Sequence, residues 1–194
     1  MKKAVRPKSS FLNLRILCAA ALLAALSAVL GKYLQVPIGD SIRLSLENLP
    51  ILMAGIFFGP LVGGMVGVTA DLLGCLMVGY TVNPIIAVGA TLIGVLSGMI
   101  ARIATRHDRP LTAGSIYLAV AVAHTVGSMT VKTIGLAVYY STPTEVLLWR
   151  IPIYIAIGAL EGSVILLLAR NRIFMGELER LRHHRQKRGN GHDL

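Results

Sequence analysis

The sequence predicts an all-α integral membrane protein with six transmembrane helices and both termini in the cytoplasm. Of the 194 residues, 55% are hydrophobic and only 14% are charged, whereas soluble domains carry about 25% charged residues. The apolar residues form runs long enough to cross a bilayer, and the basic residues flank these runs. The net charge of +10 therefore indicates a membrane surface and not a soluble protein that binds nucleic acid.

Five apolar runs define the expected helices, over residues 16–34, 44–79, 84–101, 111–140 and 146–169. A spanning helix needs about 20 residues, so the second run is too long for one helix. Gly59-Pro60 divides it into 44–58 and 60–78, because proline lacks the backbone N–H that a helix interior requires. The 44–58 helix would be about 22 Å long, shorter than a hydrocarbon core of about 30 Å. One of its ends is therefore expected to meet a cavity lined by protein.

The basic residues set the orientation, because cytoplasmic loops are enriched in Lys and Arg. Of the 19 basic residues, 15 lie before residue 16, in the loop after 84–101, or after residue 169. Six helices place these three segments on one side. Met1-Lys2-Lys3 before an alanine-rich run also fits a secretory signal peptide, but an even helix count requires this run as a first span. The expected divisions are a basic arm (1–14), a six-helix membrane domain (15–170) and a basic, solvated tail (171–194) that extends the last helix.

Small residues recur at every fourth position in several of the expected helices. Ala20, Ala24 and Ala28 form one such face in the first helix, and glycines do so in the later helices. Small residues let helix backbones approach closely in lipid. Internal packing is the favoured interpretation for the glycines. For the three alanines, internal packing and docking to another subunit remain equally open.

Four basic residues are exceptions to the orientation pattern: Lys32, Arg43, Lys132 and Arg150. Lys132 and Asp71 are expected at a similar depth, about 12 Å below the outer surface, where they would form an ion pair. The outer half then holds a surplus of positive charge, with Glu47 as a second candidate anion, and this surplus suits a ligand that carries carboxylates. The alternative is a purely structural Asp71–Lys132 pair, with both arginines reaching the headgroups.

Aromatic residues at the outer helix ends complete the candidate site. Tyr80, Tyr139 and Trp149 are each either interfacial anchors or platforms that stack on a flat heteroaromatic ligand. Asn83 is grouped with them. The deeper His124 is interpreted as a packed, hydrogen-bonding residue, whereas Glu161 is a candidate proton carrier.

Motifs for catalysis are absent from the sequence. It contains no phosphate-binding loop of the GxxxxGKS/T type, no HExxH, no GxSxG and no carboxylate cluster for a metal. Cys18 and Cys75 have no metal-ligand spacing and are expected to be packed hydrophobes. The prediction is a protein that is not an enzyme and that needs neither a cofactor nor a metal.

The segments Ile42–Ile51 (IRLSLENLPI), Ala54–Gly64 (AGIFFGPLVGG) and Asp71–Gly74 (DLLG) resemble the S components of energy-coupling factor (ECF) transporters, the folate family in particular. The length and helix count are similar over residues 12–170. Arg150 corresponds to a basic residue near the start of the family's last helix, and the alanine face of the first helix is similar to the segment that docks on the coupling subunit.

The resemblance implies a substrate-binding subunit in a bacterial cell membrane. Such a subunit binds its vitamin, here folate, from outside under the loop that joins the first two helices, and it topples while docked on a coupling subunit driven by two ATPases. Its site residues would be Arg43, Asp71, Tyr80, Asn83, Lys132, Tyr139, Trp149 and Arg150. Alternatives are an S component for pantothenate or a queuosine precursor, or a self-sufficient proton-coupled carrier that uses Asp71 or Glu161.

Overall fold

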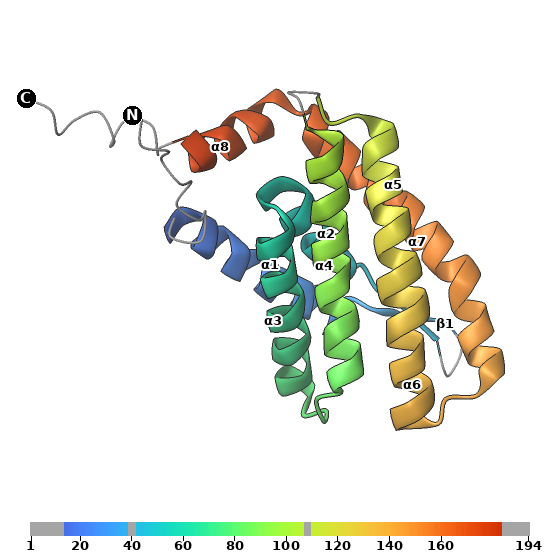
Figure 1. The fold of residues 1–194 in the computed structure, drawn as a ribbon. Coiled ribbons are helices and arrows are strands. Elements are labelled where there is room, and N and C mark those ends of the chain that lie inside the picture. Colours follow the sequence, from blue (N-terminus) through green and yellow to red (C-terminus); the bar gives the residue numbers. More distant parts are fainter. Residues whose placement is uncertain (1–13, 39–41, 107–109, 184–194) are drawn as a thin grey trace, which may run out of the picture.

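A computed structural model describes residues 14–38, 42–106 and 110–183. Helices dominate this part of the chain, and a two-stranded hairpin joins the first two (Figure 1). In chain order the elements are α1 (Leu14–Lys32), β1 (Val36–Ile38), β2 (Ile42–Leu44), α2 (Asn48–Phe58), α3 (Pro60–Val78), α4 (Pro84–Ala104), α5 (Ala113–Ala123), the π-helix η2 (His124–Val131), α6 (Lys132–Tyr140), α7 (Thr144–Arg170) and α8 (Arg172–His183).

Five helical segments of the described chain are long and apolar enough to cross a membrane: α1, α3, α4, the continuous rod from Ala113 to Tyr140, and α7. The predicted helix boundaries are confirmed to within a few residues. The helix α2 is apolar but only 11 residues long, shorter still than the sequence predicted. The basic arm expected at 1–14 lies outside the described residues except for Leu14.

The hairpin corrects the prediction of a purely helical protein. β1 and β2 pair in antiparallel register, with Val36 opposite Leu44 and Pro37 opposite Arg43. β2 also packs against α7, so the connection between α1 and α2 reaches the last spanning helix (Figure 1).

Close packing of α2, α3 and α4 forms the centre of the bundle. A Cβ atom added at Gly94 would lie 2.0 Å from the carbonyl oxygen of Gly63, so the backbones of α3 and α4 touch directly. Gly59, with φ of 102°, ends α2, and Pro60 begins α3. That positive φ lies in a region that glycine adopts without strain. The Gly59-Pro60 break predicted from the sequence is confirmed.

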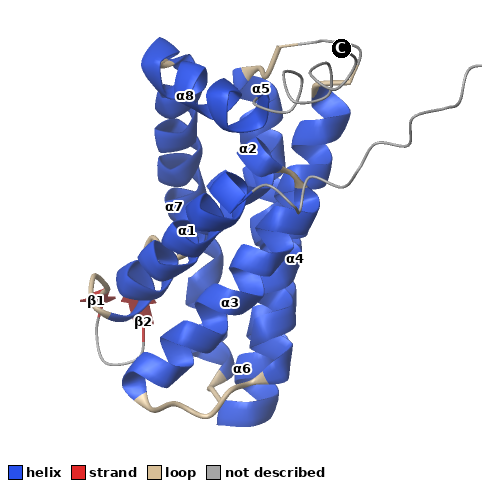
Figure 2. Ribbon diagram, turned by 90° about the vertical axis from the view of Figure 1, so that its left-hand side faces the viewer, coloured by secondary structure: helices blue, strands red, loops and turns tan. Residues whose placement is uncertain are grey.

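The helix α1 runs obliquely to α3 in Figure 1 and lies beside it in Figure 2, and it packs on α2 and α3. The buried side of α1 carries the predicted stripe of small residues: Ala24 is 2% exposed and Ala28 is 3% exposed, and Ala20 packs against the same core. The structure thus places this stripe in internal packing. The alanines on the opposite side, Ala21 and Ala25, are exposed.

The rod from Ala113 to Tyr140 changes from α- to π-helical geometry at its centre, over His124–Val131. Two hydroxyl groups reach back five residues in this region. Thr130 donates to the carbonyl of Thr125 at 2.8 Å, and Thr133 donates to the carbonyl of Ser128 at 3.3 Å. Short π-helical segments concentrate at functional sites, and this one lies in the middle of a spanning helix.

The helix α8 is a separate element, which corrects the prediction that the tail extends α7. The chain breaks at Asn171, whose side-chain oxygen accepts hydrogen bonds from the backbone N–H groups of Ile173 and Phe174. Phe174 packs edge-on against Phe57 of α2 with ring centroids 5.3 Å apart, and Leu178 is 4% exposed. The tail is therefore not solvated on all sides. One face of α8 is part of the core.

This burial predicts a stability contribution from α8. Replacing Leu178 with alanine should lower the free energy of unfolding by about 2–4 kcal/mol, because a buried leucine leaves a cavity. Ile173 on the same helix is 80% exposed, and Ile173→Ala should change stability by less than about 0.5 kcal/mol. Thermal unfolding of the detergent-solubilised protein measures both. Equal effects would show that α8 does not pack on the bundle in solution.

Candidate ligand-binding site

Polar residues from several elements meet in the half of the bundle next to the hairpin. Lys132 begins α6, and its side chain is 7% exposed. Its ammonium donates hydrogen bonds to Glu47 Oε1 at 2.9 Å and to Asn48 Oδ1 at 3.2 Å. Glu47 and Asn48 lie where the chain leaves the hairpin and enters α2, so the short α2 helix places polar groups, and not apolar ones, at this depth.

The charge state of Glu47 follows from this contact. Burial by itself would raise the pKa of the Glu47 carboxyl, but the ammonium of Lys132, with smaller contributions from Lys32 and Arg150, holds that pKa below its ordinary value. The carboxylate is therefore charged at neutral pH, and Glu47 and Lys132 form an ion pair. The sequence named Glu47 only as a second candidate anion and gave Asn48 no role.

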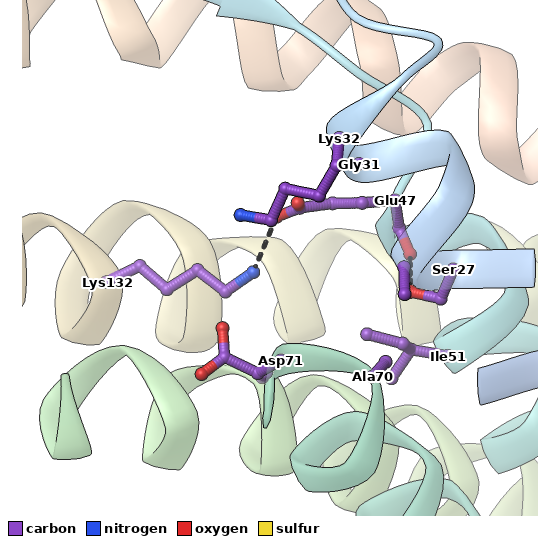
Figure 3. Close-up of a pocket in the computed structure, with 10 residues that line it drawn as sticks. Ser27, Gly31, Lys32, Glu47, Ile51, Ala70, Asp71 and Lys132 are labelled. Atoms are coloured by element: carbon purple, nitrogen blue, oxygen red, sulfur yellow. Dashed lines mark hydrogen bonds and ion pairs between the residues drawn. The ribbon is translucent and has the colours of Figure 1, made fainter. Parts of the chain in front are cut away.

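A cavity opens beside this ion pair (Figure 3). Its empty space, with the open mouth included, is about 280 Å³. Polar and charged side chains alternate with small apolar ones on its walls, which α1, α2, α3, α4, α6 and the segment before α2 contribute. The lining residues are Ser27, Ala28, Gly31, Lys32, Glu47, Ile51, Ala70, Asp71, Ala90 and Lys132.

Asp71 lies in this cavity, but its predicted ion pair with Lys132 is wrong. The ammonium of Lys132 is bound by Glu47, and the described residues include no salt bridge of Asp71. Instead, Asp71 Oδ2 is buried without a hydrogen-bond partner among them. The two residues face the same cavity (Figure 3), so the structure brings them close together without a direct contact.

Arg150 points into the bundle from the first turns of α7. Its Nη2 group donates to the carbonyl of Ser128 and to the hydroxyl of Tyr154, each at 3.4 Å, and its guanidinium lies 5.0 Å from the centre of the Tyr154 ring. Both hydrogen bonds are long, and Arg150 Nε is buried without a partner among the described residues. Most of the donor capacity of this cation is therefore unused.

Five of the predicted site residues whose side chains are described do not line the cavity: Tyr80, Asn83, Tyr139, Trp149 and Arg150. Asn83 is 2% exposed and structural: it caps α4 and donates to the carbonyl of Gly135 at 3.1 Å. Tyr139 and Trp149 are 54% and 65% exposed and do not line the cavity, an arrangement typical of interfacial anchors. Tyr80 lies near the cavity edge, with the Lys32 ammonium 5.7 Å from its ring centre. Arg43 lies in β2, and its side chain is outside the described part.

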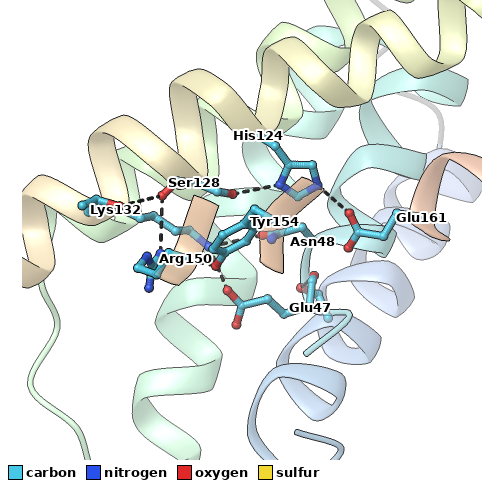
Figure 4. A network of polar contacts seen from close by, with 10 residues as sticks. Glu47, Asn48, His124, Ser128, Lys132, Arg150, Tyr154 and Glu161 are labelled. Atoms are coloured by element: carbon cyan, nitrogen blue, oxygen red, sulfur yellow. Dashed lines mark hydrogen bonds and ion pairs between the residues drawn. The ribbon is translucent and has the colours of Figure 1, made fainter. Parts of the chain in front are cut away.

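A second polar cluster, deeper in the bundle, joins the rod to α7 (Figure 4). His124 Nε2 lies 2.6 Å from Glu161 Oε2, and His124 Nδ1 lies 3.1 Å from Ser128 Oγ. The predicted hydrogen-bonding role of His124 is thus confirmed, with Glu161 as its partner. The participation of Ser128 and Tyr154 was not predicted, because neither stands out in an apolar sequence.

The described residues contain no group of three or more His, Cys, Asp or Glu side chains that could hold a metal ion. Charged groups of both signs gather in the half of the bundle next to the hairpin. Lys32, Lys132 and Arg150 supply donors, and Glu47 and Asp71 supply acceptors. A ligand with both acidic and hydrogen-bond-donating groups would satisfy the unpartnered atoms of Asp71 and Arg150.

Comparisons with known proteins agree with this arrangement. The model of the family described as "ECF transporter, substrate-specific component" matches residues 15–171. The folate transporter FolT of Clostridium novyi (strain NT) is 29% identical over 121 residues, which cover 59% of this chain and 62% of that protein. The chain thus matches about three fifths of the length of this relative.

Solved structures share the fold. A crystal structure of FolT bound with folic acid has a TM-score of 0.64 at 18% identity and covers 81% of this chain and 95% of its own. The S component of a bacterial ECF transporter has a TM-score of 0.62 at 23% identity, covering 81% and 94%. An S component for biotin has a TM-score of 0.59 at 18% identity, covering 84% and 93%. At these identities the likeness establishes the fold and not the ligand.

Proposed function

Because the chain belongs to the family of substrate-specific components of ECF transporters, we propose that it binds folate, or a closely related vitamin, and delivers it into the cell. It carries out no chemistry of its own. Delivery depends on a transmembrane coupling subunit and two ATPase subunits. The curated FolT relative and the FolT structure with folic acid support folate as the ligand.

The observation that carries this proposal is the pair of buried, unpartnered polar atoms on Asp71 and Arg150. Folate has a flat pterin whose amino group and ring N–H are donors, and a glutamyl group with two carboxylates. Asp71 Oδ2 needs a donor and matches the pterin. The Arg150 guanidinium has free donors and matches a carboxylate, for which charge-assisted hydrogen bonds are the strong kind. A ligand of this type offers a hydrogen-bond donor to Asp71 and a carboxylate to Arg150.

Arg150 is the residue to test. Arg150→Ala should weaken folate binding by about ten- to a hundredfold, because a hydrogen bond to a charged group contributes about 1.5–3 kcal/mol. A pterin that lacks the glutamyl carboxylates should lose much less affinity. Arg170→Ala is the matched control, since Arg170 is exposed at the other end of α7. Ligand is added outside sealed right-side-out vesicles, so that binding also reports the orientation.

Two outcomes would contradict the proposal. Equal loss of affinity for folate and for the carboxylate-free pterin would mean that Arg150 does not bind a carboxylate. Failure of wild-type protein to bind any pterin would favour an S component for another vitamin, such as pantothenate, a queuosine precursor or biotin.

The proposed topology has six spans, with α2 as a short span and both termini in the cytoplasm. Basic residues support this orientation: Arg102 lies in the last turn of α4 and Arg106 follows that helix, and Arg170, Arg172 and Arg180 lie at or after the end of α7. The end of α4, the start of α5 and α8 lie at the same end of the molecule (Figure 1). The cavity then belongs to the outer half, and the hairpin lies over it on the external side.

The lipid-facing side of α1 is the proposed contact for the coupling subunit. Ala21 and Ala25 are exposed there, beside the exposed Leu17, Leu22 and Leu26, and small residues one turn apart permit close helix contact. Ala21→Trp should abolish uptake by the assembled transporter while folate affinity stays within about twofold. Leu160→Trp on α7, which is also exposed, is the control. Loss of binding together with uptake would instead assign Ala21 to the fold.

A further inference from the structure

A chain of buried contacts connects the deep cluster to the arginine of the proposed site. Glu161 on α7 and His124 at the start of η2 are 0% and 2% exposed, and their side chains meet at 2.6 Å. With a neutral imidazole, Nε2–H donates to the carboxylate, and Nδ1 then accepts from the Ser128 hydroxyl at 3.1 Å. The carboxylate thus fixes both the ring tautomer and the rotamer of Ser128.

Ser128 is where this chain meets Arg150. Its carbonyl oxygen accepts from Arg150 Nη2 at 3.4 Å and from the Thr133 hydroxyl at 3.3 Å. Tyr154 closes the arrangement from α7, since its ring is 5.5 Å from the His124 ring and 5.0 Å from the guanidinium carbon of Arg150. Figure 4 shows the residues as one connected group.

We propose that Glu161 and His124, acting through Ser128, position the guanidinium of Arg150 for an anionic group of the ligand. This inference rests on the proposed function. An arginine side chain is long and loses considerable rotamer entropy when a ligand fixes it, so a site gains affinity when the cation is held in place beforehand. Of the two 3.4 Å hydrogen bonds that orient Arg150, the one to the Ser128 carbonyl depends on where the backbone of η2 lies. The His124–Glu161 pair anchors that backbone to α7.

Two variants interrupt this series of side-chain contacts at different residues. Ser128→Ala removes the hydroxyl that His124 contacts and keeps the carbonyl that Arg150 contacts. Glu161→Leu removes the acceptor that orients His124. Each should weaken folate binding by about fivefold, the effect of losing one hydrogen bond, and should leave the affinity for a pterin without carboxylates within about twofold.

Conservative and matched variants separate positioning from general damage. Glu161→Gln keeps a side-chain oxygen that accepts from His124 and should restore most of the affinity lost in Glu161→Leu. Ser163→Ala is the control, because Ser163 lies two residues from Glu161 on α7 and bonds Tyr117 and Ala159 instead. It should bind both ligands normally. Thermal unfolding and size-exclusion profiles check folding, and if Glu161→Leu is not recovered folded, Ser128→Ala and Glu161→Gln carry the test.

A double-mutant cycle gives the decisive readout. In an Arg150→Ala background, Ser128→Ala should cause no further loss of folate affinity, because its effect passes through the arginine. Additive losses, equal losses for both ligands, or a Glu161→Gln variant as weak as Glu161→Leu would each overturn the inference. If Arg150→Ala alone loses the preference for carboxylates and Ser128→Ala does not, the inference fails and the proposed function stands. If Arg150→Ala keeps that preference, both fail.

Discussion

Replacing Lys132 with methionine is expected to lower the stability of the protein by about 3 kcal/mol. The methionine fills a similar volume, but it strands the Glu47 carboxylate that now lies 2.9 Å from the Lys132 ammonium. Removing one partner of a buried ion pair costs about 3–5 kcal/mol, and the Glu47 side chain is 29% exposed, so the loss is expected near the lower end of this range, out of a total of about 5–15 kcal/mol. A lowered thermal midpoint in detergent and a reduced folded peak in size exclusion would record the loss.

Both partners of this ion pair can also be replaced in one variant. Glu47→Gln combined with Lys132→Met leaves no unpaired charge at this contact, so the double variant should recover most of the lost stability. Asp71→Asn combined with Lys132→Met should not recover it, because Glu47 remains charged. Rescue by Asp71→Asn alone would instead support the ion pair predicted from the sequence. The exposed Glu177–Arg180 pair is a control, and Arg180→Ala should cost less than about 1 kcal/mol.

Gly94→Ala is expected to separate α3 from α4. The added methyl group would lie 2.0 Å from the carbonyl oxygen of Gly63 and 2.2 Å from its carbonyl carbon, and a backbone in the middle of a helix has little room to yield. Overpacking of this kind costs about 1–3 kcal/mol and occasionally more, and a clash with backbone places this site at or above the upper end. Because α3–α4 contacts are central to the bundle, a sharply lower thermal midpoint should follow.

Gly114→Ala is the matched substitution. Gly114 lies in the first turn of α5, and nothing lies within 4 Å of the position of an added Cβ. The change should leave stability unchanged or raise it by about 0.5–1 kcal/mol, since alanine is the better helix former. Similar midpoints for the two alanine variants would mean that the helices do not touch at Gly94.

The helices were predictable because their signals are local. The Gly59-Pro60 break followed from the length of one apolar run and from a residue that cannot donate. The hairpin gave no such signal, because its strands are three residues long and one of them contains Pro37. The break before α8 was missed because the charge spacing of the tail fits a continued helix. What separates α7 from α8 is the cap at Asn171 and the burial of Leu178.

The sequence predicted which residues lie at the same level along their helices, but not which of them contact each other. A rise of about 1.5 Å per residue placed Lys132 and Asp71 at one level, and both do line the cavity. Which anion meets the lysine depends on the rotation of each helix, and the short α2 brings Glu47 there first. Asn83 was grouped with the site, but its side-chain oxygen caps α4 and its amide donates to the carbonyl of Gly135 in α6. The contact between Ser128 and Arg150 arises within a π-helical segment that has no sequence signature.

The π-helical segment has an evolutionary consequence. Each residue of an α-helix turns the chain by about 100°, so the extra residue that a π-turn accommodates changes the direction of every side chain after it. Lys132 and Gly135, which follow η2, face α4 and the cavity in this register. Gain or loss of one codon between positions 124 and 131 would therefore change the direction of all the side chains from Lys132 to Tyr140 together. The loops, the other spans and the part of this helix before η2 would keep their lengths and places. Ligand preference in such a bundle is therefore open to change in a single genetic step.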